Sequence, residues 1–378
     1  MQYVHGGDIY GYTAQYPGQN VLDFSANINP RGIPEAVRQA MLDAVEQCAQ
    51  YPDPFCRALT NALAQTYGLP PETFFCANGA AEVFYRLADV LRPQTALITA
   101  PTFAEYEAAL THFGCSVRHH RLRAQENFAV TARILDELDG VDVCILCNPN
   151  NPTGRTVDPN LMACIVAQCQ KKRIRLIVDE CFADFLLDEP AHTLLPQVMR
   201  CDLLVVVRAF TKMYAVPGVR LGWCATADRL LLERLHAAGQ PWNVSVFAQA
   251  CGVAALGLKD YAAQTAKMIA LLRQELADAL ADCGFRVFPG EANYLLFSTA
   301  QIDLRERLLP RGILIRDCSN YIGLGAGYFR VAVKTKEENA RLMRAVREVL
   351  TDGESDHGAG DSVQRREKCV GCGPVPHL

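Results

Sequence analysis

The sequence has 378 residues, of which half are apolar and about a fifth are charged, and its formal net charge is −4. A chain of this length and composition can bury a large core and forms two to three domains, which excludes a disordered or fibrous protein. The slightly acidic balance gives no basic surface for nucleic acid or an anionic membrane. We therefore expect a small-molecule substrate.

The sixteen cysteines are spread through apolar segments, so we expect most of them to be buried thiols rather than a disulfide framework. The first eight residues have neither the basic nor the apolar region of a signal peptide. Apolar runs such as residues 203–207 are strand-sized and far too short for a membrane helix. These features predict a cytoplasmic protein without a membrane span.

Residues 1–33 are rich in Gly, Asn, Pro and Tyr, which predicts an N-terminal arm lying on another part of the protein. After it, short apolar strands alternate with amphipathic helices. We expect strands at residues 74–77, 96–100, 141–147, 174–179, 203–208 and 219–225. This alternation predicts a large α/β domain, residues 34–258, with a mostly parallel sheet covered on both faces and a ligand beyond the carboxyl ends of its strands.

The pattern of residues 259–350 predicts a second, smaller α+β domain. Its elements are expected as a helix at 260–283, strands near 287, 294–297, 313–315 and 329–333, and a helix at 336–350. Residues 351–378 are polar and Gly-rich, which predicts a disordered tail. The tail contains Cys369 and Cys372, a single Cys-x-x-Cys pair that could ligate zinc or an iron–sulfur centre or could be two free thiols. We expect no metal in the active site.

Lys212 differs from the other lysines, which lie in polar or charged surroundings. It follows a predicted buried strand and stands among Phe210, Met213 and Tyr214. Partial desolvation in such a place lowers the pKa of the amine and makes it nucleophilic. The alternative is a lysine at a strand end whose apolar stem is buried while its ammonium reaches water.

Two charged residues, Arg220 and Asp179, are candidates for the same site because of their positions in the sequence relative to Lys212. Arg220 follows eight residues later in a glycine-flanked loop, where a guanidinium can bind a phosphate with two hydrogen bonds. Asp179 ends the predicted strand 174–179, and a carboxylate at the end of a buried strand needs a cationic partner. A pyridinium nitrogen would be such a partner.

Two loops complete this set of residues. Residues 148–154 (NPNNPTG) form a proline-fixed turn that directs Asn151 toward the same edge of the sheet, although alone they would mark only a turn. At the first strand–helix junction, Gly79 and Ala80 begin a helix whose backbone N–H groups can bind a phosphate. Asn-Gly by itself more often marks a plain turn.

Together and in this order, the motifs resemble the active site of fold-type I pyridoxal-phosphate enzymes, the aspartate aminotransferase superfamily, over about residues 1–350. The resemblance implies that Lys212 binds pyridoxal 5'-phosphate covalently and that Asp179 pairs with its ring nitrogen. It also implies that Asn151 donates to the phenolic oxygen of the cofactor and that Arg220 binds the cofactor phosphate.

The resemblance further implies that Phe103 covers one face of the cofactor ring and that Gly79 and Ala80 contribute to the phosphate site. One position departs from the pattern, because Ala209 stands where the superfamily usually has a serine or threonine phosphate ligand. The phosphate is then bound less tightly, or Thr211 and backbone groups compensate.

Two families within the superfamily are most similar. Residues 51–53 (YPD) resemble histidinol-phosphate aminotransferases, whose tyrosine reaches the cofactor phosphate of the neighbouring subunit, so Tyr51 implies a homodimer with composite sites. The sequence is still more similar to threonine-phosphate decarboxylases of cobalamin biosynthesis, and Phe182 fits them because aminotransferases usually have tyrosine there. This stronger resemblance is carried by residues 5–7, 23–30, 101–106, 211–218 and 316–321.

A phosphorylated amino acid needs two cationic groups in its site. Arg330 matches the superfamily arginine that binds the α-carboxylate, the alternative being an exposed arginine at a strand end. Arg316 and His5, with Asn320 nearby, are candidates for the substrate phosphate, although His5 could instead cap the arm. Asn27, from its place in the family pattern, could line the pocket.

The resemblance therefore predicts pyridoxal-phosphate-dependent decarboxylation of L-threonine O-3-phosphate to (R)-1-amino-2-propanol O-2-phosphate in cobalamin biosynthesis. The alternative is histidinol-phosphate aminotransferase activity, with amino transfer to 2-oxoglutarate. The two reactions differ in which bond at the substrate Cα stands perpendicular to the cofactor ring, which sequence motifs do not report. Serine phosphate remains a further alternative, because one methyl group is worth only about 1 to 3 kcal/mol in a pocket.

Overall fold

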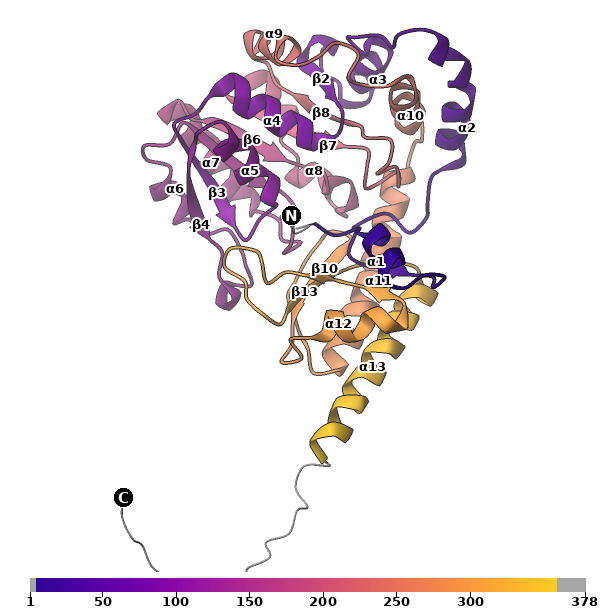
Figure 1. The fold of residues 1–378 in the computed structure, drawn as a ribbon. Helices are drawn as coiled ribbons and strands as arrows, with labels where there is room; N and C mark the ends of the chain where they lie inside the picture. The colour runs from indigo at the N-terminus through magenta and orange to yellow at the C-terminus, as the bar shows by residue number, and fades with distance from the viewer. Residues whose placement is uncertain (1–4, 359–378) are drawn as a thin grey trace, which may run out of the picture.

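The computed structural model describes residues 5–358, and its centre is a seven-stranded sheet in the order β2-β8-β7-β6-β5-β3-β4 (Figure 1). The strands are β2 (Phe74–Ala77), β3 (Thr95–Ala100), β4 (Ser116–Arg121), β5 (Val143–Cys147), β6 (Arg175–Asp179), β7 (Leu204–Ala209) and β8 (Gly222–Ala225). Strand β8 runs antiparallel to both of its neighbours, and the other pairings are parallel. The predicted mostly parallel sheet is confirmed.

Helices cover both faces of this sheet, which explains why its central strands are continuous apolar runs. One face packs on α4 (Ala80–Leu91), α5 (Ala104–His112) and α9 (Arg229–Ala237). The other face packs on α2 (Glu35–Asp43), α3 (Arg57–Tyr67), α7 (Pro159–Lys172) and α10 (Val246–Leu256). Two short helices, α6 (Ile134–Glu137) and α8 (Glu189–His192), lie in connections.

A second, antiparallel sheet of four strands has its own apolar core. Its strands are β9 (Arg286–Val287), β10 (Tyr294–Ser298), β12 (Arg316–Asp317) and β13 (Tyr328–Ala332), and its helices are α11 (Tyr261–Asp282), α12 (Leu304–Leu308) and α13 (Lys336–Gly358). The last helix was expected to end at Leu350 and instead continues eight residues further, into the predicted tail. The remainder of that tail, with Cys369 and Cys372, lies outside the described residues.

The N-terminal segment contains more regular structure than its sequence indicates. It forms α1 (Ile9–Gln15) and β1 (Leu22–Asp23), and β1 pairs in parallel with β11 (Ile313–Leu314), so residues 313–314 serve the arm rather than the four-stranded sheet. The arm then crosses to the large sheet, where Asn29 N donates to Lys212 O at 3.1 Å. Figure 1 shows this segment lying across the smaller sheet and its helices.

Two expectations from the sequence, buried thiols and the lack of a membrane-spanning helix, can be compared with the described residues. Most of these cysteines are buried free thiols. Within residues 5–358, no helix is both long enough and apolar enough to cross a bilayer.

Candidate active site

A cavity of about 330 Å³ opens at the carboxyl ends of β5, β6 and β7, where the N-terminal arm, the large sheet and the smaller sheet meet. This is the position expected for a ligand in an α/β fold. The cavity brings together ten residues predicted from the sequence: His5, Asn27, Ala80, Phe103, Asn151, Asp179, Thr211, Lys212, Arg220 and Arg330.

Lys212 lies in this cavity in the loop after β7. Burial lowers the pKa of its amine to about 8, and the nearby cations Arg330 and Arg220 act in the same direction. Its Nζ is 5.9 Å from the ring centroid of Phe182. A lysine with this pKa carries a usable fraction of free amine near neutral pH, which a nucleophile toward an aldehyde requires.

Asp179 ends β6 on the floor of the cavity and is buried. Its Oδ1 accepts from the backbone N–H of Cys181 at 2.9 Å, and its Oδ2 accepts from Tyr106 Oη at 2.5 Å. Burial nevertheless raises the pKa of the carboxyl group, because these hydrogen bonds and the charge of Lys212 only partly offset desolvation. A cation in the cavity would stabilise the carboxylate, and a protonated ring nitrogen fits that need.

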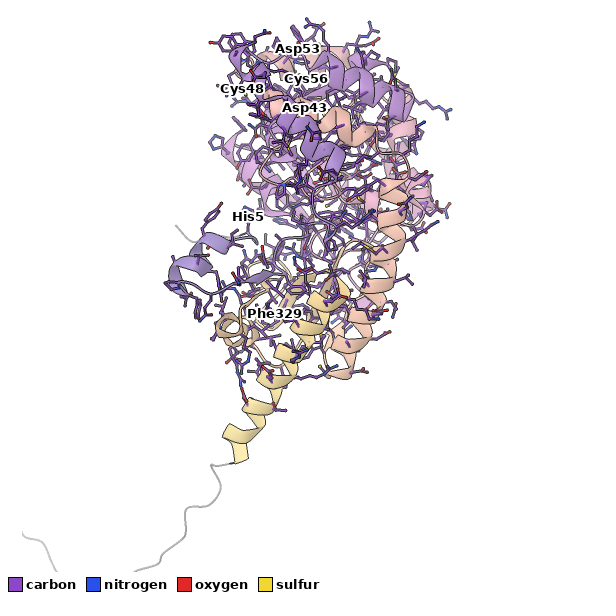
Figure 2. All side chains as sticks on the ribbon, turned by 90° about the vertical axis from the view of Figure 1, so that its right-hand side faces the viewer. His5, Asp43, Cys48, Asp53, Cys56 and Phe329 are labelled. Atoms are coloured by element: carbon purple, nitrogen blue, oxygen red, sulfur yellow. The ribbon has the colours of Figure 1, made fainter. Side chains whose placement is uncertain are left out.

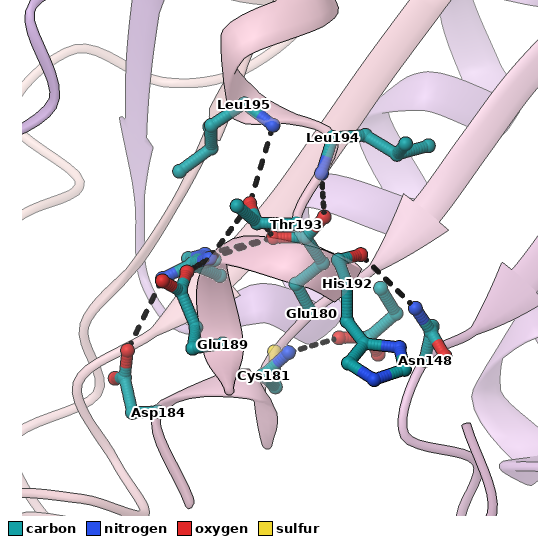
Figure 3. A network of polar contacts seen from close by, with 11 residues as sticks. Asn148, Glu180, Cys181, Asp184, Glu189, His192, Thr193, Leu194 and Leu195 are labelled. Atoms are coloured by element: carbon teal, nitrogen blue, oxygen red, sulfur yellow. Dashed lines mark hydrogen bonds and ion pairs between the residues drawn. The ribbon is translucent and has the colours of Figure 1, made fainter. Parts of the chain in front are cut away.

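The residue after Asp179 anchors this strand end in a polar network behind the cavity (Figure 3). Glu180 accepts from Arg208 of β7 at 2.8 Å, from Thr193 Oγ1 at 2.7 Å and from the backbone N–H of Leu194 at 2.7 Å. The side chains of Glu180 and Arg208 are 0% and 4% exposed. Removing one partner of such a buried pair costs about 3 to 5 kcal/mol, so the network holds the ends of β6 and β7 together.

One end of the cavity is built to bind an anion. Helix α4 begins there after Gly79, no side chain caps its first N–H groups, and Ala80 and Ala81 line the cavity. Gly79 has φ +86°, and a Cβ atom on it would lie 2.4 Å from Nη2 of Arg220. The guanidinium therefore packs directly against the glycine, beside the helix N-terminus, which suits a phosphate group.

At another part of the cavity, Arg330 is 5% exposed and hydrogen-bonds Asn151 Oδ1 and, at 2.6 Å, Ser25 O. Its Nε is buried and has no hydrogen-bond partner among the described residues, and the same holds for Oδ1 of Asn27. Buried polar atoms are normally satisfied. Two unsatisfied atoms beside one cavity indicate a ligand with polar groups on this side.

His5, from the arm, lies over Phe103, with 5.7 Å between their ring centroids. Its Nε2 is 2.7 Å from Oε1 of Glu105, on the first turn of α5. Figure 2 shows His5 at the level where the large domain meets the smaller one. The arm therefore covers the cavity from the side of the smaller sheet.

Three predicted site residues lie elsewhere. Arg316 and Asn320, joined by a 2.9 Å hydrogen bond, line a neighbouring cavity of similar size that shares Phe103 and Tyr321 with the first. Tyr51 is 78% exposed and stacks on Trp242, with 4.4 Å between ring centroids. Figure 2 places Cys48 and Asp53, on either side of Tyr51, at the end of the large domain away from His5.

The structure also places residues in the site that the sequence analysis did not assign, namely Tyr106, Cys181 and Tyr321. Tyr106 had a usable signal, because it stands three residues after Phe103 at the start of a helix and must share its face. The other two follow the motifs that carry Asp179 and Arg316. Taken together, the described residues fit pyridoxal phosphate: an anion site, a buried carboxylate that forms no ion pair among the described residues, and a half-buried amine with a lowered pKa.

The sequence matches the family model described as aminotransferase class I and II over residues 19–346. The chain belongs to this family. It is 38% identical to the threonine-phosphate decarboxylase of Salmonella typhimurium, over 92% of this chain and 96% of that protein. It is 29% identical to an adenosylcobalamin biosynthesis bifunctional protein of Leptospira interrogans, over 90% of this chain and 40% of that protein.

A solved structure of the same class is the histidinol-phosphate aminotransferase from Clostridium acetobutylicum. Its TM-score is 0.83 at 30% identity, and the match covers 88% of this chain and 100% of that chain. This likeness agrees with the fold-type I architecture expected from the motifs.

Proposed function

We propose that this protein is a pyridoxal-phosphate-dependent decarboxylase that converts L-threonine O-3-phosphate to (R)-1-amino-2-propanol O-2-phosphate and CO₂ in cobalamin biosynthesis. The observation that carries the proposal is the 38% identity to a threonine-phosphate decarboxylase over nearly the whole chain. The cavity supports the proposal because it contains the half-buried amine of Lys212 and two separate cationic groups, Arg220 and Arg330. The bifunctional relative of Leptospira interrogans supports the cobalamin assignment.

The residues of the cavity divide into those for the cofactor and those for the substrate. Lys212 attaches the cofactor, Asp179 pairs with its ring nitrogen, and Asn151 hydrogen-bonds its phenolic oxygen. Phe103 covers its ring. The cofactor phosphate is bound by Arg220, by Thr211 and by the first N–H groups of α4, namely those following Gly79 and at Ala80.

The substrate is held by Arg330 at its α-carboxylate, with Asn27 beside it. Its phosphate is bound by His5 from one cavity and by Arg316 and Asn320 from the neighbouring one, since the two cavities share Tyr321. A substrate with two anionic ends matches this separation of cationic groups.

When bound, pyridoxal phosphate supplies an electron sink for the charge left on Cα as CO₂ departs. Asp179 keeps a negative charge at the ring-nitrogen position, which favours that sink. Cα then needs a proton, and Nζ of Lys212 is the group positioned to deliver it, because its lowered pKa suits proton transfer near neutral pH.

One structural observation favours decarboxylation over amino transfer. Phe182 is 6% exposed, lines the cavity and packs on Tyr294, so an apolar ring occupies the place where aminotransferases of this class usually present a phenol. The sequence identities also favour decarboxylation, because the chain is 38% identical to the decarboxylase of Salmonella typhimurium and 30% identical to the aminotransferase of Clostridium acetobutylicum.

We further propose a homodimer in the cytoplasm. Tyr51 stacks on the exposed Trp242, and Leu42, Val45 and Phe55, which are near Tyr51 in the sequence, are exposed as well. Exposed apolar side chains of this kind are typical of an interface, and an interface here would bring Tyr51 to the cofactor phosphate of a second copy. Buried free thiols are the form expected in a reducing compartment.

The test supplies the holoenzyme with threonine phosphate and, separately, with histidinol phosphate plus 2-oxoglutarate, and measures CO₂ and glutamate. We expect CO₂ from threonine phosphate without any keto acid, and none from the Lys212→Ala variant. Serine phosphate should react with lower kcat/KM. Glutamate without CO₂ would assign the aminotransferase reaction instead. A protein that takes up no pyridoxal phosphate and shows no borohydride-labelled Lys212 would refute both.

A further inference from the structure

The side chain of Tyr106 lies behind Asp179 and has no role in the chemistry described so far. It comes from the first turn of α5 and is 0% exposed. Its ring packs edge-on against Phe103 and Phe84, with centroid distances of 5.6 Å and 4.7 Å. The aromatic contacts fix the ring, so the hydroxyl has a defined position at the floor of the cavity.

That hydroxyl points at one oxygen of Asp179, with 2.5 Å between Tyr106 Oη and Asp179 Oδ2. An ionised carboxylate only accepts hydrogen bonds, so the phenol donates. Burial raises the pKa of Tyr106 well above its ordinary value, and the charge of Asp179 adds to the effect, so the donor keeps its proton. The backbone N–H of Cys181 holds the other carboxylate oxygen.

We propose that Tyr106 is a positioning residue that holds the carboxylate of Asp179 charged and oriented toward the ring nitrogen of pyridoxal phosphate, an inference that rests on the proposed function. Burial alone opposes a charge on Asp179, and each hydrogen bond to the carboxylate favours it. The backbone donor from Cys181 cannot be lost by substitution, whereas the donor from Tyr106 can. Tyr106 is therefore the side chain through which the sequence sets the strength of this pairing.

The experiment compares two ligands that differ at one ring atom. Apoprotein is titrated with pyridoxal phosphate and with the analogue whose ring nitrogen is replaced by C–H. Because a hydrogen bond to a charged group is lost, Tyr106→Phe should weaken pyridoxal phosphate binding by about tenfold to a hundredfold. Binding of the analogue should change little, since it presents no cation to Asp179.

Three further measurements separate positioning from a merely structural effect. In an Asp179→Ala background, Tyr106→Phe should cause no further loss of affinity. Tyr67→Phe is the control, because it removes the hydroxyl of a half-buried tyrosine that packs on Trp223 outside the cavity, and it should leave both affinities unchanged. The absorption spectrum of bound pyridoxal phosphate should shift in Tyr106→Phe and not in Tyr67→Phe.

Equal weakening of both ligands by Tyr106→Phe, or a full further loss in the Asp179→Ala background, would overturn the inference and leave the proposed function standing. An unchanged affinity and spectrum in a folded Tyr106→Phe protein would do the same. A wild-type protein that binds neither ligand would instead overturn the proposed function and this inference with it.

Discussion

The lowered pKa of the half-buried Lys212 makes the stability of the apoprotein depend on pH. Its pKa is about 8 in the folded chain and near 10.5 when exposed. Below pH 8 the amine is charged in both states, and the folded state bears the cost of burying that charge. As pH rises from 8 toward 10.5 the folded state loses its proton first, so this cost disappears.

Lys212→Met should therefore raise the free energy of unfolding of the apoprotein by about 3 kcal/mol at pH 7, and the gain should shrink steadily between pH 8 and pH 10. Urea unfolding of both proteins across this range measures the difference. Lys267→Met, on exposed α11 surface, is the control and should give no such gain. A gain that stays constant with pH would show that packing, not the charge, causes it.

Ala209 stands where the superfamily usually has a serine or threonine that binds the cofactor phosphate. It ends β7, lines the cavity and is 8% exposed. Ala209→Ser adds a hydroxyl donor beside the anion site, so it should tighten pyridoxal phosphate binding by about tenfold, the value of one hydrogen bond to a charged group. Ala209→Val, which adds bulk without a donor, should not. If the serine variant gains nothing, Thr211 and the backbone already satisfy the phosphate.

Gly79, in the turn from β2 into α4, has a matched control in Gly114, which lies between α5 and β4. Gly79 has φ +86° with Arg220 against it, whereas Gly114 has φ +84° and nothing within 4 Å of an added Cβ. Alanine at either position should cost about 1 to 3 kcal/mol of stability through backbone strain. Gly79→Ala alone should displace Arg220 and weaken pyridoxal phosphate binding at least tenfold. Equal binding by both variants would mean that Arg220 does not bind the phosphate.

The central strands and the edge strand β2 were predictable from the sequence, whereas the other edge strand, β4, was not. β7 reads as an uninterrupted run of Leu and Val because helices cover both of its faces. β4 was missed because it is an edge strand with the sequence SVRHHR, in which only His120 is buried, so its side chains leave no apolar pattern. The arm strand β1 was missed for a related reason, since two residues carry no periodicity.

The site combines residues of the arm, the large sheet and the smaller sheet. The motifs therefore identified candidate site residues but not which of them line the same cavity. Asp179 ends β6 and Lys212 follows the neighbouring parallel strand β7, so both could be placed at one edge from the sequence. Arg220 precedes β8, and the antiparallel direction of β8 brings it to the same edge. Arg330 and Arg316 pair with each other across β13 and β12, yet they line different cavities. That separation depends on how the two domains pack, which no local pattern reports.

The C-terminal residues beyond α13 should be dispensable for catalysis. The candidate site is complete without them, and among the described side chains of α13 the last that packs on the apolar core is that of Leu350. A chain ending at Gly358 removes Cys369 and Cys372, and it should keep wild-type kcat/KM for threonine phosphate. Zinc and iron content of both proteins is measured alongside. Loss of a bound metal together with activity would show that the tail contributes to the reaction.

Mixing two impaired variants tests the composite site directly. Tyr51 is exposed and stands outside the cavity of its own chain, so it can act on a cofactor phosphate only in a second copy. Tyr51→Ala should therefore weaken cofactor binding and turnover, and Lys212→Ala should abolish turnover.

In a mixed dimer, the chain with intact Lys212 receives intact Tyr51 from its partner. Random mixing should thus restore about a quarter of wild-type activity, since half of the dimers are mixed and each has one complete site. Sedimentation should show a dimer throughout. A fully active monomer, or no recovery on mixing dimers that exchange subunits, would place every catalytic group within one chain.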